Sequence, residues 1–206
     1  MISFVYFDVG GVVIRDFSKT NKWSIMKYDL GVPEEINKDF DRLFDYYELN
    51  ELCLSRDVET LIPIFENKFN IHFPKNYSWL NDFANRFEKN YFIWPVIKKI
   101  NKNCRIGLLT NMYLGMFKAI QNRSLLPPFN WDVLVDSSVE RLQKPDPKIY
   151  ELAEKKSKSK HKEILFIDNG KKNIDAAKKF GWKTFLYDPS DHKESCQNLL
   201  TYFTSL

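Results

Sequence analysis

The sequence predicts an α/β fold: a doubly wound, Rossmann-like parallel sheet with a helical segment inserted after its first strand. An apolar run that fits a buried strand stands at Phe4–Phe7, and further such runs occur only after residue 95. After that point they alternate with helical patterns, which is typical of βαβ units. Residues 16–92 hold amphipathic helical stretches and no convincing strand run. These observations place a helical insertion between strands one and two.

Five short apolar runs are predicted as the strands of this sheet. They are Phe4–Phe7, Arg105–Leu109, Asp132–Val135, Ile164–Ile167 and Lys183–Tyr187.

Two helices of the sheet-forming part have clear ends. One is predicted over Pro147–Lys156, with Asp146 as its N-cap and proline at its first position. The other is predicted over Asn173–Phe180 and stops at Gly181, a residue suited to a helix C-terminus.

Three helices are predicted within the insertion. The first begins at Pro33 and carries apolar residues to Tyr47 at spacings of three and four. The second, with Ser55 as its N-cap, extends to Phe69, and the third spans Tyr77–Tyr91. We expect the many Phe and Tyr side chains of this segment to form its own core.

Composition restricts the class of protein. The 206 residues suffice for one sizeable core with a small insertion. The net charge of +4, from 31 basic and 27 acidic residues, is too small to indicate a nucleic-acid partner. The one basic run, residues 155–162, is interpreted as a solvated helix end and loop.

Cysteine usage and hydropathy predict a location. The three cysteines are widely spaced, which argues against a disulfide framework or a zinc site and fits a reducing cytoplasm. No apolar run approaches the roughly 18 residues of a membrane span, and the N-terminus does not resemble a signal peptide. We therefore expect a cytoplasmic protein, a monomer or a homodimer, with no membrane partner.

Polar residues capable of chemistry follow four of the predicted strands or their connections. In chain order they are Asp8, Thr110 with Asn111, Lys144, and Asp168 with Asn169. In a doubly wound sheet the carboxyl ends of the strands meet at one crevice, so these residues are predicted to converge. Each also has a plainer interpretation as a turn, cap or surface residue. Their joint occurrence at strand ends favours a shared site, which none of the histidines (His72, His161, His192) matches.

The segments FDVGG, LLTN, KPDPKIY and FIDNGKKNIDAAKKFGW resemble, in order and spacing, the four motifs of the haloacid dehalogenase-like hydrolase superfamily. The resemblance covers nearly the whole chain. It implies a core domain of residues 1–15 and 93–206 and a helical cap domain of residues 16–92. The D-x-G-(G/N)-V opening is similar to a branch of small-capped sugar-phosphate phosphatases.

The resemblance implies a role for each residue of the predicted site. Asp8 would be the nucleophile that forms an aspartyl-phosphate. The phosphate would be bound by Gly10, Gly11, the Thr110 hydroxyl, the Asn111 main-chain N–H and the Lys144 ammonium. Mg²⁺ would be held by Asp8, the main-chain carbonyl of Gly10 and Asp168, with Asn169 nearby in place of an acid that the family often has.

Gly10 departs from the standard site of the family, where a second aspartate serves as general acid and base. Three functions are compatible with this departure. The first is a Mg²⁺-dependent phosphatase for small phosphomonoesters of the sugar-phosphate type with good leaving groups. The second is a phosphate-binding or interaction protein with little turnover. The third, ranked lowest, is a 2-haloacid dehalogenase, because Gly-Gly-Val follows Asp8 where dehalogenases usually have an aromatic residue and then Gly-Thr.

Overall fold

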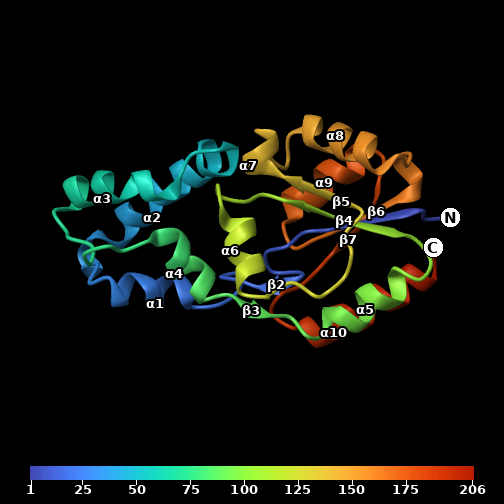
Figure 1. The fold of residues 1–206 in the computed structure, drawn as a ribbon, viewed down its shortest axis with the longest axis horizontal. Coiled ribbons are helices and arrows are strands. Elements are labelled where there is room, and N and C mark those ends of the chain that lie inside the picture. Colours follow the sequence, from blue (N-terminus) through green and yellow to red (C-terminus); the bar gives the residue numbers. More distant parts are fainter.

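The first strand of the chain lies at the centre of a five-stranded parallel sheet, as the computed structural model of all 206 residues shows (Figure 1). The strands follow the order β5-β4-β1-β6-β7, so the predicted α/β fold is confirmed. Their bounds are β1 Phe4–Phe7, β4 Arg105–Thr110, β5 Val133–Asp136, β6 Ile164–Asp168 and β7 Lys183–Leu186.

The composition of β1 explains its central place. All four of its residues are fully buried. Phe4 and Tyr6 pack into the apolar cluster on one face of the sheet, while Val5 and Phe7 pack into the cluster on the other. A strand covered on both faces has a continuous apolar sequence rather than an alternating one.

Strand register brings the ends of the central strands together. Phe7 pairs with Leu108 of β4 on one side and with Ile167 of β6 on the other. The next residue, Asp8, is therefore flanked by the carboxyl ends of both neighbouring strands. This is the edge at which open α/β sheets bind ligands.

Helices cover both faces of the sheet (Figure 1). α8 (Pro147–Ser157) and α9 (Lys171–Lys179) lie on one face, and α5 (Ile93–Ile100) and α10 (His192–Thr204) on the other. The shorter helices of this part are α6 (Met116–Asn122), α7 (Ser137–Glu140) and the 3₁₀ helix η4 (His161–Glu163).

The predicted ends of α8 and α9 agree closely with the structure. The Asp146 carboxylate accepts a hydrogen bond of 2.9 Å from the Lys148 N–H, which confirms it as the N-cap of α8. α9 begins at Lys171, two residues before the predicted start. Gly181 follows it with φ of +100°, a conformation that glycine adopts without steric cost.

Residues 16–92 hold four helices that lie to one side of the sheet, at the left in Figure 1. They are α1 (Lys22–Asp29), α2 (Asn37–Asn50), α3 (Ile62–Phe69) and α4 (Trp79–Asn85), with 3₁₀ turns η1 (Glu34–Ile36), η2 (Leu52–Leu54) and η3 (Val58–Leu61). We call this segment the helical insertion.

The structure corrects two predicted helices of the insertion. Ser55 is not the cap of the second helix, because it ends η2 in the left-handed region with φ of 106°. Asp57 caps η3 instead, accepting a hydrogen bond of 3.0 Å from the Glu59 N–H. The third predicted helix stops at Asn85, after which the chain forms a short strand.

Two short strands mark the points where the chain leaves the sheet and returns to it. β2 (Ile14–Arg15) and β3 (Glu88–Lys89) pair antiparallel. The fully buried Asn90, directly after β3, donates a hydrogen bond of 2.7 Å to the carbonyl of Val12. The two connections between sheet and insertion are thus fixed to each other.

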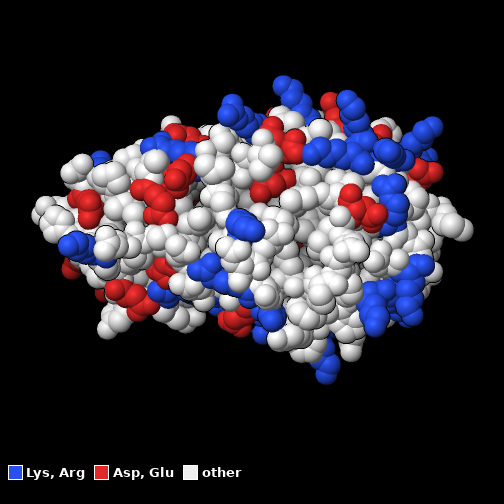
Figure 2. Space-filling model, in the orientation of Figure 1, with Lys and Arg blue, Asp and Glu red and all other residues white.

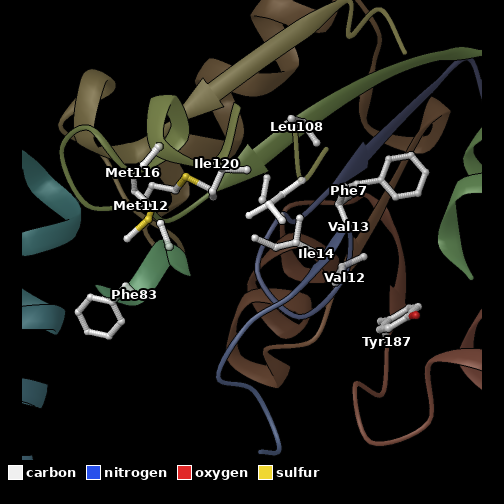
Figure 3. Close-up of a cluster of buried hydrophobic side chains, with 14 of the residues drawn as sticks. Phe7, Val12, Val13, Ile14, Phe83, Leu108, Met112, Met116, Ile120 and Tyr187 are labelled. Atoms are coloured by element: carbon white, nitrogen blue, oxygen red, sulfur yellow. The ribbon is translucent and has the colours of Figure 1, made fainter. Parts of the chain in front are cut away.

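One apolar cluster runs from the sheet into the insertion (Figure 3). Phe83 of α4 lies beside Met112 and Met116 in that view. The Phe83 ring also packs edge-on against Tyr113, with 5.6 Å between ring centroids. Phe40, Phe65, Phe73 and Trp79 are buried in this core, as predicted, whereas Tyr28 and Tyr46 are exposed.

The surface carries both signs of charge in the face that Figure 2 shows. Lys and Arg gather around α8, and acidic residues are interspersed with basic ones over the insertion. The basic run, residues 155–162, forms the end of α8 and the turn after it, and most of it is exposed, in line with the prediction. None of the helices combines the length and apolar character that crossing a membrane requires.

Candidate active site

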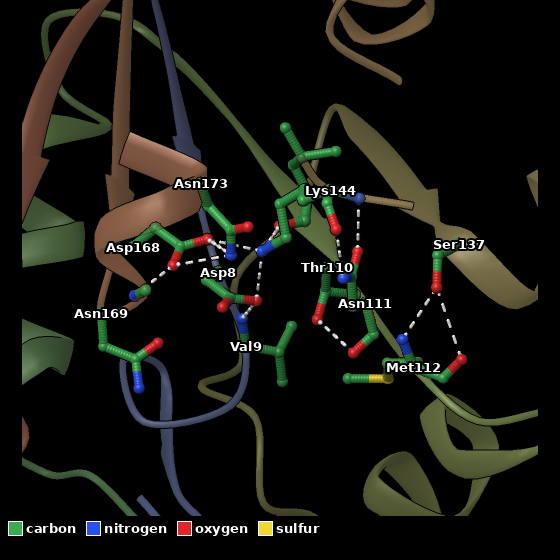
Figure 4. Close-up of polar contacts among 12 residues, drawn as sticks. Asp8, Val9, Thr110, Asn111, Met112, Ser137, Lys144, Asp168, Asn169 and Asn173 are labelled. Atoms are coloured by element: carbon green, nitrogen blue, oxygen red, sulfur yellow. Dashed lines mark hydrogen bonds and ion pairs between the residues drawn. The ribbon is translucent and has the colours of Figure 1, made fainter. Parts of the chain in front are cut away.

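Asp8 stands directly after the central strand, and its side chain is almost wholly buried. Its Oδ1 atom accepts a hydrogen bond of 2.7 Å from the Val9 N–H and lies 3.0 Å from the Nζ atom of Lys144 (Figure 4). These two contacts orient the carboxylate. Both involve Oδ1, so the Oδ2 atom contacts neither a basic group nor a main-chain N–H.

Lys144 joins the two carboxylates of the site. Its Nζ atom lies 2.6 Å from Asp168 Oδ2 as well as 3.0 Å from Asp8 Oδ1, and it donates to the Leu109 carbonyl at 3.1 Å. The residue is 3 % exposed, so an ammonium with three donors meets three acceptors away from water.

The Asn111 side chain fixes the main chain of Lys144 from both sides. Its Oδ1 atom accepts from the Lys144 N–H at 2.8 Å, and its Nδ2 atom donates to the Lys144 carbonyl at 2.9 Å. The sequence had suggested only a main-chain role for Asn111. The structure adds a side-chain role, which is to position the lysine.

Asp168 ends strand β6 and is fully buried. Its Oδ1 atom accepts from the Gly170 N–H at 2.6 Å, and the Asn173 amide nitrogen lies 3.2 Å from both carboxylate oxygens. Asn173 was missed by the sequence analysis. The available signal was its place five residues after Asp168 in FIDNGKKNID, in the first turn of α9.

The remaining predicted residues lie around this group. Thr110 is buried at the end of β4, beside Asp8 in Figure 4. Asn169 donates a hydrogen bond of 3.0 Å to Ser18, in the connection to the insertion. Gly11 has φ of +71°, and a Cβ atom there would lie 2.3 Å from the Asn169 amide nitrogen. The predicted residues are therefore all brought to one edge of the sheet.

Burial and the neighbouring charges both act on the pKa values of Asp8 and Lys144. For each residue the main ionic contact opposes the effect of burial. Burial raises the pKa of Asp8, an effect that the Lys144 charge opposes and the Asp168 charge reinforces. Burial alone would lower the pKa of Lys144, but the carboxylates of Asp168 and Asp8 outweigh it and raise that pKa. The lysine therefore stays charged.

A cavity of about 590 Å³ opens between this group and the insertion. Its polar lining includes Asn111, Lys144 and Asn173 of the sheet-forming part. Its apolar lining includes Trp23, Phe44, Phe83, Phe87, Met112 and Met116. A mostly apolar cavity with a few polar groups suits a small ligand with one charged group.

The donor atoms of the site fit a hard divalent cation. Asp8 and Asp168 offer carboxylate oxygens at neighbouring strand ends. No set of three or more His, Cys, Asp or Glu side chains is arranged to hold a metal. Mg²⁺ uses one or two carboxylates and keeps several waters, whereas zinc takes three or four nitrogen, sulfur or oxygen ligands from the protein. The residues present therefore suit Mg²⁺.

Solved structures with this fold include HAD family enzymes and L-2-haloacid dehalogenases. A predicted HAD-like family hydrolase from Porphyromonas gingivalis has 22% identity and a TM-score of 0.73, over 97% of this chain and 98% of that one. A HAD family enzyme from Bacteroides thetaiotaomicron, in complex with magnesium and inorganic phosphate, has 14% identity and a TM-score of 0.71, over 93% and 96%. An L-2-haloacid dehalogenase from Xanthobacter autotrophicus, with chloropropionic acid covalently bound, has 17% identity and a TM-score of 0.63, over 91% and 78%.

At these identities the solved structures establish the fold alone. No curated protein matches the chain by sequence. The model of the haloacid dehalogenase-like hydrolase family matches residues 5–181, which include Asp8, Thr110, Lys144 and Asp168. The chain therefore belongs to the haloacid dehalogenase-like hydrolases.

Proposed function

We propose that the protein is a Mg²⁺-dependent phosphatase that hydrolyses a small phosphomonoester, of the sugar-phosphate type, through an aspartyl-phosphate on Asp8. The observation that carries the proposal is the position of Asp8, directly after the central strand and 3.0 Å from Lys144, which lines the cavity. Phosphoryl transfer requires an aligned nucleophile and neutralisation of the charge on the phosphate oxygens. This pair provides both.

The Oδ2 atom of Asp8 is the nucleophilic oxygen in this proposal. Oδ1 is held by the Val9 N–H and by Lys144, which fixes the carboxylate plane and leaves Oδ2 available to phosphorus. As the Oδ2–phosphorus bond forms, the P–O bond to the leaving oxygen breaks, and that oxygen takes up a proton as the alcohol leaves. Water then cleaves the aspartyl-phosphate and restores the carboxylate.

The phosphate oxygens would be bound by groups around Asp8. These groups are the Thr110 hydroxyl, the Asn111 main-chain N–H, the Lys144 ammonium and the turn at Gly10 and Gly11. Lys144 acts as a fixed positive charge. The two hydrogen bonds from the Asn111 side chain hold its main chain, and the Asp168 carboxylate holds its ammonium.

Asp8 and Asp168 would hold the Mg²⁺ ion, which when bound neutralises charge on the transferring phosphoryl group. Asn173 supports this role by orienting both oxygens of Asp168. The Bacteroides thetaiotaomicron enzyme, crystallised with magnesium and phosphate on the same fold, is compatible with this use of the metal.

The helical insertion would act as the cap that selects the leaving group. It supplies Trp23, Phe44, Phe83 and Phe87 to the lining of the cavity that Lys144 also lines. It also contacts the sheet-forming part directly, through the hydrogen bond that the Tyr113 hydroxyl donates to Glu48 of α2. Closure of such a cap excludes water from the reacting groups.

The test is a phosphate-release assay on purified protein. Hexose 1-phosphates, hexose 6-phosphates and p-nitrophenyl phosphate are supplied with Mg²⁺ or with a chelator. We expect release that requires Mg²⁺ and is abolished in Asp8→Asn. Equal release by wild type and D8N, or no release from any ester, would contradict the proposal. Halide release from a 2-haloacid in the presence of chelator would instead identify a dehalogenase.

A further inference from the structure

We propose that Asp16 is the general acid and base of the site, in place of a side chain that Gly10 does not provide. The inference deepens the proposed phosphatase function and rests on it. Its basis is the place that the Asp16 carboxylate occupies beside Gly10.

The Asp16 carboxylate fills the space of a residue-10 side chain. A Cβ atom built on Gly10 would lie 2.5 Å from Asp16 Oδ2, closer than any real contact allows. Gly10 stands two residues after Asp8, on the turn that faces the cavity. A carboxylate thus occupies the point to which a side chain of residue 10 would begin to project.

The Asp16 side chain is held so that one oxygen faces the site. Oδ1 accepts a hydrogen bond of 2.8 Å from the Ser18 N–H, which leaves Oδ2 directed toward Gly10. Asp16 lines the cavity together with Asn111 and Lys144. It is therefore within the same solvent space as the groups proposed to bind phosphate.

The other acidic residues and the histidines do not offer this position. Only two further acids line the cavity, Asp45 and Glu48, and both come from α2 of the insertion. Glu48 accepts the Tyr113 hydroxyl, and Asp45 is exposed. No histidine lines the cavity. Asp16 is thus the one carboxyl group of the cavity that adjoins the turn after Asp8.

Asp16 lies in the first connection between the sheet and the insertion. It follows β2 directly, and β2 pairs with β3 where the insertion returns to the sheet. The acid–base group is therefore carried by the connection between the sheet and the insertion, whereas the nucleophile is carried by the central strand. The packing of the insertion on the sheet therefore also determines the position of the Asp16 carboxylate.

Two proton transfers follow from this placement. In the first half-reaction Asp8 Oδ2 bonds to phosphorus, the ester P–O bond breaks, and protonated Asp16 gives its proton to the leaving oxygen. In the second, the Asp16 carboxylate takes a proton from water as the water oxygen bonds to phosphorus. The Asp8–phosphorus bond breaks, inorganic phosphate leaves, and Asp16 is protonated again.

The test compares leaving groups of different basicity. Wild type, Asp16→Asn and the control Asp39→Asn are assayed with Mg²⁺ on p-nitrophenyl phosphate and on phenyl phosphate. Asp39 is an exposed acid of α2 that does not line the cavity, so D39N makes the same chemical change elsewhere. We expect D16N to lower kcat/KM for phenyl phosphate by about 10²–10⁴-fold. The loss should be smaller for p-nitrophenyl phosphate, whose leaving group needs no proton, and D39N should behave as wild type.

Two further measurements separate catalysis from folding. Because D16N lacks the base that activates water, phosphoenzyme should accumulate on Asp8 and be visible after rapid acid quench. The double variant Gly10→Asp/Asp16→Ala places a carboxylate at residue 10 and removes the Asp16 oxygen with which it would collide. It should therefore regain part of the phenyl phosphatase activity that D16N loses.

Three outcomes would overturn the assignment. In the first, D16N turns over both esters as fast as wild type does, and in the second it loses activity on both esters equally without phosphoenzyme accumulation. In either case Asp16 is not the acid and base, while the phosphatase function stands. If wild type cleaves neither of these esters nor any hexose phosphate of the panel above, both this inference and the proposed function fail.

Discussion

Lys144 is the residue on which the electrostatics of the site depend. Its ammonium is buried between Asp8 and Asp168, so removing it leaves two carboxylates without their counter-charge. Breaking a buried ion pair by removing one partner typically costs about 3–5 kcal/mol. We expect Lys144→Met to lower the free energy of unfolding by this order, as measured by urea denaturation without added metal.

The matched double variant tests the cause of that loss. Lys144→Met/Asp8→Asn removes one of the two unpaired charges, so it should recover part of the stability lost in K144M. If K144M is as stable as wild type, or if D8N adds a further loss to it, the ion pair is not the reason.

At the level of single residues, strand ends carried most of the predictive signal. Asp8, Thr110 and Asp168 follow or end strands with a clear apolar sequence pattern. The parallel register brings the three residues to the carboxyl edge of the sheet. Asn173 and Asp16 were not predicted. Asn173 depends on which side of α9 faces the sheet, and Asp16 depends on how the chain folds back after β2. No local pattern reports either of these tertiary facts.

Asn90 holds together the two connections between sheet and insertion. Its fully buried amide donates to the Val12 carbonyl at 2.7 Å, and Asn90→Ala would leave that acceptor unpaired. A buried acceptor without a donor costs about 1–3 kcal/mol. We expect a loss of this size in urea unfolding. The exposed Asn103→Ala, which removes a surface hydrogen bond of 3.3 Å, should change stability much less. Equal effects would contradict the role of Asn90.

Helix α10 begins at His192, whose environment predicts a dependence of stability on pH. Burial lowers the pKa of this imidazole below 6.5, and the charge of Arg15 acts in the same direction. The Nδ1 atom lies 3.1 Å from the Tyr187 hydroxyl and 3.2 Å from the Asn90 amide nitrogen, so Nδ1 of the neutral ring is placed to accept one hydrogen bond there.

The sign of the effect follows from linkage. Below pH 6.5 the unfolded chain binds a proton at His192 more readily than the folded protein does. The stability contributed by the neutral ring is therefore full above 6.5 and falls as the pH drops toward the lower pKa of the folded state. We expect His192→Gln to lose stability less steeply than wild type over this interval in urea unfolding. Parallel curves for the two proteins would rule the effect out.

Elements were predictable where the pattern is long and continuous. The five strands were placed within one residue of their observed ends, because each contains a short apolar run, which is buried throughout in the central strands β1 and β6. Helix α1 was missed because its apolar residues do not form a regular stripe, and only Met26 among them is fully buried. β2 and β3 have two residues each and exist because they pair with each other, so neither has a sequence signal of its own.

For the molecule as a whole, the sequence predicted a helical insertion between strands one and two, and the structure places α1–α4 there. How the insertion meets the sheet was beyond prediction. The contact includes the packing of Phe83 against Tyr113 and the hydrogen bond from Tyr113 to Glu48, which join residues far apart in the chain. The cavity exists only as a product of that packing, so its shape and lining come from the structure alone.

In the proposed mechanism Asp8 becomes covalently phosphorylated, and intact-protein and peptide mass spectrometry after rapid acid quench tests this most directly. Wild-type protein mixed with Mg²⁺ and p-nitrophenyl phosphate should gain the mass of one phosphoryl group, located on the peptide that contains Asp8. The D8N protein should gain none. Phosphate release by wild type with no modified Asp8 peptide, or the same mass gain in D8N, would contradict the account.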